Sequence, residues 1–220
     1  MKNTRSVLSV RVFGIAVIIA AIVFSAALLF AGCESDDDDG LTFNSIEDFD
    51  KWLSKRKENT PDTSYNVKLN VGSLRSSRRD IDIGDILREN YRKYVNLDLS
   101  ESTAIISGEF YSCGTLTDII LPNNTPDIQA GSFMGCINLI SITIPDSVTS
   151  IGSSAFKGCN SLTSVTFATG SNIPDANFGN GAFPEGSYGY SGNALKTAYS
   201  TGKAGTYTRV VNGETWTKQP

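Results

Sequence analysis

Cysteines are the side chains in this chain with the most distinctive chemistry. Three of the four, Cys113, Cys136 and Cys159, follow one another at a spacing of 23 residues. Thiols can form disulfides, bind zinc or act as nucleophiles. The chain has no C-x-x-C pair and no histidine, which argues against a zinc site. Three thiols cannot pair completely, so we predict buried free thiols and keep a disulfide as the second interpretation.

The spacing of the cysteines is shared by the apolar residues around them. Each set of equivalent positions holds one residue type: Ile105, Ile128 and Ile151; Phe110, Phe133 and Phe156; Leu116, Leu139 and Leu162. Self-similarity at this period predicts a solenoid of stacked units. Each unit ends in the L-x-x-L-x-L spacing of a leucine-rich repeat, which predicts a short strand there. Pro122 and Pro145 follow two of these strands and should end them.

A single unit of this length buries too little apolar surface to fold alone, so the units must stack and their ends must be covered. We therefore predict an α/β repeat: a short leucine-rich-repeat solenoid with a 23-residue period, an α/β N-terminal cap and a helix-plus-hairpin C-terminal cap. The expected boundaries are a signal peptide at 1–32, an acidic tether at 33–40, the N-terminal cap at 41–93, the repeats at 94–184 and the C-terminal cap at 185–220.

Composition excludes several classes of function. Without histidine, the chain cannot use imidazole bases or His-containing triads. Lys157 is the single cation between residues 100 and 170, so a nucleic-acid groove is not expected there. The cations of residues 55–93 alternate with carboxylates, as on a solvated surface. We expect no enzymatic activity, no catalytic residue, no metal and no cofactor.

The first 33 residues have the pattern of an export signal. Lys2, Arg5 and Arg11 precede an uncharged apolar run at 12–30. Residues 29–33 resemble the lipobox of bacterial lipoproteins, in which the cysteine, here Cys33, is diacylated and becomes the mature N-terminus. The apolar run is also long enough to span a bilayer, so an uncleaved signal anchor is the second interpretation.

Residues 34–40, with four consecutive aspartates, form a like-charge run that repels itself and stays extended. We interpret them as a spacer; a second interpretation, which the resemblance to lipoproteins suggests and the spacing itself does not show, is that they help to sort the protein to the outer surface. A calcium loop is disfavoured because no glycine-punctuated ligand pattern follows.

The flanks of the repeats have patterns of their own. Ser45 and Asp82 are predicted helix caps, each followed by apolar residues at helical spacing, and strands are expected around Val67 and Leu97. Trp52 and Tyr91 are expected in the core. After the repeats we predict a short helix at 194–199 and a hairpin with a two-residue turn at Asn212-Gly213, and we expect Trp216 to cover the end of the core.

A ligand would meet the strand positions that point away from the core. These are mostly hydroxyl side chains, which could bind a polar protein or glycan but also pack well on any solenoid. They are Thr117, Asp118, Ile120, Ile140, Ser141, Thr143, Thr163, Ser164 and Thr166.

Residues 144–167, which read IPDSVTSIGSSAFKGCNSLTSVTF, resemble the repeat unit of the BspA-like leucine-rich repeat family of bacterial surface antigens. Residues 94–100 and 204–218 resemble the flanks of treponemal members. The resemblance implies a lipoprotein of the cell envelope, displayed on the outer membrane and cell surface, with host matrix proteins or bacterial surface proteins as partners. Two functions remain open: an adhesion or protein-interaction module, and a structural or antigenic lipoprotein without a dedicated ligand. We expect a monomer that does not bind nucleic acid.

Overall fold

The computed structural model describes residues 41–220 apart from 77–80, 105 and 186–189. The expected signal peptide, Cys33 and the acidic tether therefore lie outside the described residues, as does Ile105. Within the described part of the chain, the helices are all too short or too polar to cross a bilayer.

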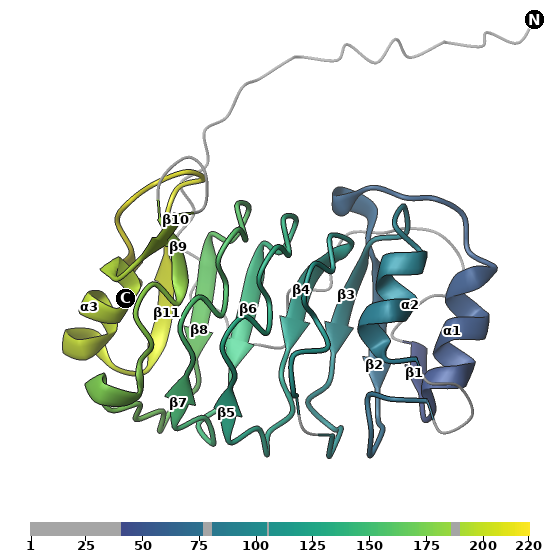
Figure 1. The fold of residues 1–220 in the computed structure, drawn as a ribbon, viewed down its shortest axis with the longest axis horizontal. Coiled ribbons are helices and arrows are strands. Elements are labelled where there is room, and N and C mark those ends of the chain that lie inside the picture. Colours follow the sequence, from purple (N-terminus) through teal and green to yellow (C-terminus); the bar gives the residue numbers. More distant parts are fainter. Residues whose placement is uncertain (1–40, 77–80, 105, 186–189) are drawn as a thin grey trace, which may run out of the picture. The chain divides into compact units, whose positions relative to one another are not determined.

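One sheet of eight strands runs through the molecule (Figure 1). Six strands are parallel and β11 and β12 are antiparallel to their neighbours. The order along the sheet is β1 (Leu41–Phe43), β2 (Tyr65–Leu69), β3 (Val95–Asp98), β4 (Leu116–Ile120), β6 (Ser141–Ile144), β8 (Ser164–Phe167), β11 (Gly205–Thr208) and β12 (Thr217–Lys218). The predicted α/β repeat with short parallel strands is confirmed.

The return segments of the coils pack on one face of this sheet and carry two small sheets. The strands β5 (Asp127–Ile128) and β7 (Ser150–Ile151) pair in parallel, and β9 (Phe183–Glu185) pairs with β10 (Tyr190–Gly192) in antiparallel fashion. Between the sheet and the returns, the rings of Phe110, Phe133, Phe156 and Phe183 stack with centroids 5.3, 5.0 and 4.6 Å apart. Phe183 joins the stack although the last interval is longer than the period, because residues before it form the extra turn η2 (Asp175–Asn177).

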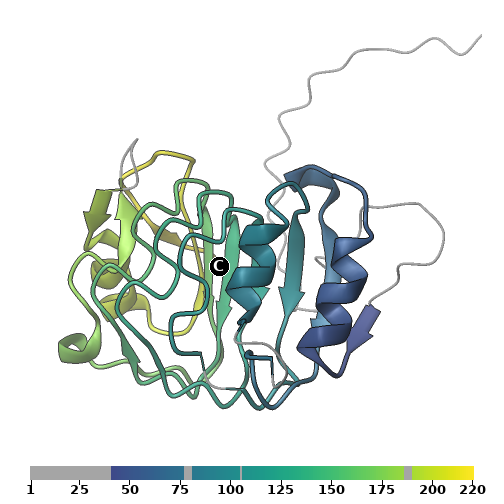
Figure 2. The ribbon, with the colours of Figure 1, turned by 45° about the vertical axis from the view of Figure 1, so that its right-hand side comes forward.

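The N-terminal cap continues the sheet with helical returns. The helices α1 (Ile46–Ser54) and α2 (Ile83–Glu89), with the short η1 (Pro61–Thr63), connect β1, β2 and β3 on the face that the coil returns also cover (Figure 2). The predicted caps are confirmed, because Ser45 accepts from the Asp48 amide and Asp82 from the Asp85 amide. Trp52 packs against the core, but the prediction for Tyr91 is wrong: α2 ends at Glu89, so Tyr91 falls in the following turn and is 68% exposed.

The C-terminal cap contains the predicted helix, α3 (Ala194–Gly202), and a hairpin with a longer loop than expected. Thr208 pairs with Thr217, so residues 209–216 connect β11 to β12. A turn does form at Asn212-Gly213, where Asn212 has φ +61° and Gly213 N donates to Val210 O. The two-residue hairpin is wrong because Arg209 and Trp216 leave the ladder to enter the core. Trp216 covers Phe183 edge-on, as predicted.

Two arginines satisfy backbone groups at the ends of the array. In successive coils the carbonyls of Met134 and Lys157 accept from amides of the preceding coil. Before the first of these coils the return segment is the helix α2, and Arg88 Nη1 of that helix donates to the Tyr111 carbonyl at 2.7 Å. At the other end, the buried Arg209 donates to Leu162 O, Asn160 O and Gly213 O. These side chains supply the donors that a further coil would have supplied.

The phenylalanine stack gives a test of the packing. Phe133→Ala removes a ring between two others and leaves a cavity, so we expect the free energy of unfolding to fall by about 3–5 kcal/mol. Ile137→Ala, at a 51% exposed position of the same coil, should change it by no more than about 0.5 kcal/mol. Chemical denaturation followed by circular dichroism measures both. Equal losses in the two variants would contradict the stacked core.

Candidate functional site: the outer face of the sheet

Strand register places the outward-facing side chains in two rows that cross the sheet. The first row is Asn66, Asn96, Asp118, Ser141, Ser164 and Thr208, and the second is Lys68, Asp98, Ile120, Thr143, Thr166 and Thr206. We call these two rows, with Ile140 and Thr163 at the strand starts, the outer face. Ile140 is 38% exposed, and the other predicted contact residues except Thr117 are partly exposed. The structure thus brings eight of the nine predicted residues together on this face.

Thr117 is the exception, and its predicted exposure is wrong. The register between β3 and β4 shifts between Val95 and Asn96, which makes Thr117 the extra residue of a β-bulge. Its side chain is fully buried and its Oγ1 lies 2.8 Å from Val95 O, 2.5 Å from Asn96 Oδ1 and 2.9 Å from Ser64 Oγ. A threonine with this many internal partners is not available to a ligand.

Asp118 is the carboxylate nearest the middle of the outer face. It projects from β4 and accepts a hydrogen bond from Ser141 Oγ on β6. Burial raises the pKa of the Asp118 carboxyl, and the Ser141 hydrogen bond opposes this rise. Lys68, the cation of the second row, pairs instead with Glu101 at 2.7 Å. Asp118 therefore presents a partly desolvated carboxylate that no described cation pairs.

At the two ends of the outer face, polar side chains on neighbouring strands form hydrogen bonds with one another. Asn96 Nδ2 donates to Asn66 Oδ1 at 2.8 Å, and the hydroxyls of Thr166 and Thr206 lie 3.0 Å apart. Between these ends, Ile120 and Ile140 lie on either side of the row that contains Asp118 and Ser141. The middle of the face thus combines two apolar side chains with one carboxylate, an arrangement that suits a protein segment better than a small metabolite.

The three repeat cysteines form part of the core. All are buried free thiols, as predicted. The Cys136 thiol donates to Phe110 O at 2.9 Å and the Cys159 thiol to Phe133 O at 3.0 Å, so each thiol bonds the coil before it. Burial raises the pKa of the Cys113 thiol. The pKa of the Cys136 thiol is raised by the contact of Cys136 with the Cys159 thiol and by burial. Buried thiols with raised pKa values are poor nucleophiles and stabilise the stack instead.

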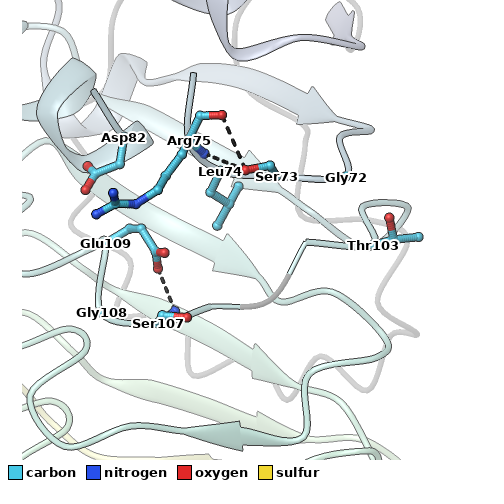
Figure 3. A pocket seen from close by; sticks show the side chains of 9 residues that line it. All are labelled: Gly72, Ser73, Leu74, Arg75, Asp82, Thr103, Ser107, Gly108 and Glu109. Atoms are coloured by element: carbon cyan, nitrogen blue, oxygen red, sulfur yellow. Dashed lines mark hydrogen bonds between the residues drawn. The ribbon is translucent and has the colours of Figure 1, made fainter. Parts of the chain in front are cut away.

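A pocket of about 580 Å³ lies beside the first coil and was not predicted (Figure 3). Arg75 extends toward Asp82 across it, and Glu109 lines another side. Its polar groups are occupied in local structure: Asp82 accepts from the Asp85 amide at 2.9 Å, and Glu109 accepts from the Ser107 amide at 2.6 Å. These bonds hold the start of α2 and the turn at residues 107–109 in place, so we favour the outer face as the functional site.

Comparisons with known proteins agree with the repeat architecture. Residues 89–185 match the family model of the BspA type leucine rich repeat region, in 6 copies. This repeat family is non-catalytic, and repeats of this kind are protein-interaction modules. No curated protein and no solved structure matches the chain.

The raised pKa of Asp118 predicts a pH-dependent stability. A carboxyl whose pKa is higher in the folded than in the unfolded state stabilises the fold at low pH, and this contribution is lost as the pH rises through the folded-state value. Asp118→Asn should therefore raise the thermal midpoint by a few degrees at neutral pH, and the gain should shrink as the pH falls toward the ordinary aspartate pKa. Asp146→Asn, at an exposed carboxyl of the next coil, is the control for net charge. A gain that is independent of pH would contradict the assignment to Asp118.

Proposed function

We propose that this protein is a lipid-anchored bacterial surface protein whose outer face binds an extracellular protein. The observation that carries the proposal is the middle of that face, where Ile120 and Ile140 flank Asp118 and Ser141. Apolar anchors beside a desolvated polar group are what protein interfaces use at their centres.

Comparison with the equivalent positions of the neighbouring coil indicates that Ile120 and Ile140 are particular to one coil. Position 143 is the counterpart of Ile120 and position 163 that of Ile140, and both hold threonine. A coil can therefore hold threonine at these two positions, and packing does not require the isoleucines at positions 120 and 140. Large apolar residues kept partly exposed on β4 and before β6 are consistent with a binding role.

The charges of the face indicate the chemistry of the partner. The strands β4, β6 and β8 carry Asp118 and no cation, and Asp98 and Glu101 lie at the end of β3. A partner segment with an apolar residue and a lysine or arginine would complement this surface. Host matrix proteins and other bacterial surface proteins are the partner classes we propose.

The anchor and the compartment are proposed from the head of the sequence. Cys33 follows an apolar run and small residues, and diacylation there would give two acyl chains, which is enough for stable attachment. We place the protein in the cell envelope, on the outer membrane facing outward, as a monomer.

A structural or antigenic lipoprotein without a dedicated ligand is the second candidate. The observation in its favour is the internal bonding of the face: Asn66 with Asn96, Ser141 with Asp118 and Thr166 with Thr206. Ladders of this kind stabilise a sheet whether or not anything binds it.

The anchor is tested with Cys33→Ser. Loss of the acylated thiol should move the protein from the detergent phase to the aqueous phase when cells are extracted and fractionated, because the lipid supplies the membrane affinity. External protease on intact cells should degrade the parent protein. Unchanged partitioning of the variant would favour a retained signal anchor, and full protection from protease would contradict the surface location.

The binding face is tested with Ile120→Thr combined with Ile140→Thr, which copies the threonines of the next coil. We expect saturable binding to at least one purified extracellular-matrix protein, weakened roughly ten-fold in the double variant, which corresponds to about 1.4 kcal/mol. Gln129→Ala, at an exposed position on the return segment, is the matched control and should bind as the parent does. Equal binding by all three proteins would contradict the outer face as the site, and no binding by any would favour the second candidate.

A further inference from the structure

We propose that the edge of the sheet at which the parallel strands begin lies against the bilayer that holds the anchor. We call it the starting edge. The inference rests on the proposed anchoring and adds a membrane-contacting surface made of the folded body itself.

The exposed large apolar side chains of the described residues gather at this edge. Tyr91 leads into β3, Tyr111 into β4, and Ile137 and Ile140 into β6. Val210 and Val211 follow β11, which is antiparallel to β8, and Arg209 N bonds Thr163 O at the start of β8. Val210 and Val211, 76% and 61% exposed, therefore also lie at the starting edge. Aliphatic side chains and tyrosines on one edge are the composition that partitions into a lipid headgroup region.

The position of the anchor limits how far this edge can be from the membrane. The first described strand, β1, is parallel to β2, with Leu41 level with Val67, so the chain enters the body travelling away from the starting edge. Seven residues separate Cys33 from Leu41, and the eight steps between their Cα atoms span at most about 29 Å when fully extended. Acyl chains on Cys33 would therefore hold the body within contact distance of the bilayer surface.

The distribution of charged side chains disfavours an orientation in which the opposite edge of the sheet faces the bilayer. The exposed cations Lys55, Arg56, Lys57, Arg92 and Lys157 lie in segments of the starting edge, where the exposed carboxylates Glu58, Asp62, Glu89 and Glu214 nearly balance them. The opposite edge carries Glu101, Asp127, Asp146 and the acidic first turns of α1 and α2, and its described cations Lys68, Arg75, Lys203 and Lys218 offset only part of this negative charge. An anionic lipid surface would repel the acidic edge and accept the nearly neutral one.

This orientation leaves the proposed binding face open. The strands run from the starting edge toward the opposite edge, so their outer face would stand upright on the bilayer. Membrane contact through the edge and protein contact through the face therefore use different side chains, with Ile140 at the boundary between them.

The experiment compares two positions of one coil in the full chain, reconstituted into vesicles of equal parts phosphatidylcholine and phosphatidylglycerol. Ile137→Cys places a thiol at the starting edge before β6, and Asp146→Cys places one after β6 at the opposite edge. Each is labelled with an environment-sensitive fluorophore, and nitroxide-bearing lipids serve as the quencher. The parent, whose repeat thiols are buried, gives the labelling background.

We expect the label at 137 to be quenched several-fold more than the label at 146. In the 137 protein, Val210→Ser combined with Val211→Ser should reduce the quenching, because it removes apolar contacts from the same edge. Each protein must show the parent's thermal midpoint. Equal quenching at the two positions, or stronger quenching at 146, would overturn the inference while leaving the anchor intact. A protein that does not float with the vesicles would overturn the anchoring as well.

Discussion

Every coil must present its backbone to the next at the spacing of paired strands, and the rest of the structure depends on this constraint. Parallel strands lie about 4.8 Å apart, and the phenylalanine centroids, 4.6–5.3 Å apart, follow the same spacing. A side chain that points inward must therefore pack on its own counterpart in the next coil. This explains why the phenylalanine and cysteine positions keep one residue type: a flat ring stacks on a ring, and a thiol reaches the carbonyl of the preceding coil.

The inner half of the fold could be predicted from the sequence because of that constraint. Repeated residues mark the core directly, and the helix caps at Ser45 and Asp82 are local patterns that need no knowledge of the partner strand. The errors arose where a residue depends on a distant segment. Thr117 is buried because β4 bulges against β3, and the C-terminal loop is long because Arg209 and Trp216 fill the end of the core.

The candidate site was predictable as a set of positions but not as a surface. Alternation along a strand shows which side chains point outward. It does not show which of them bond to one another across strands, as Asn66 does with Asn96, and which remain free. Nor could the sequence place the starting edge, since its apolar residues come from the loop after β11 and from turns at different positions in the period. Only the order and direction of the strands in the sheet bring them to one edge.

Arg88 and Arg209 give the array a fixed beginning and a fixed end. Each arginine bonds carbonyls of one particular coil, and Gly84 lets α2 approach so closely that a Cβ atom there would lie 1.8 Å from Glu109 O. Neither terminal coil could be exchanged for a generic unit. The middle coil has a repeat on both sides, so gene duplication within it could lengthen the protein in 23-residue steps without disturbing either end. The number of coils can therefore change in evolution without changing the two end segments on which folding depends. Related proteins with longer or shorter arrays could share the same N-terminal and C-terminal caps.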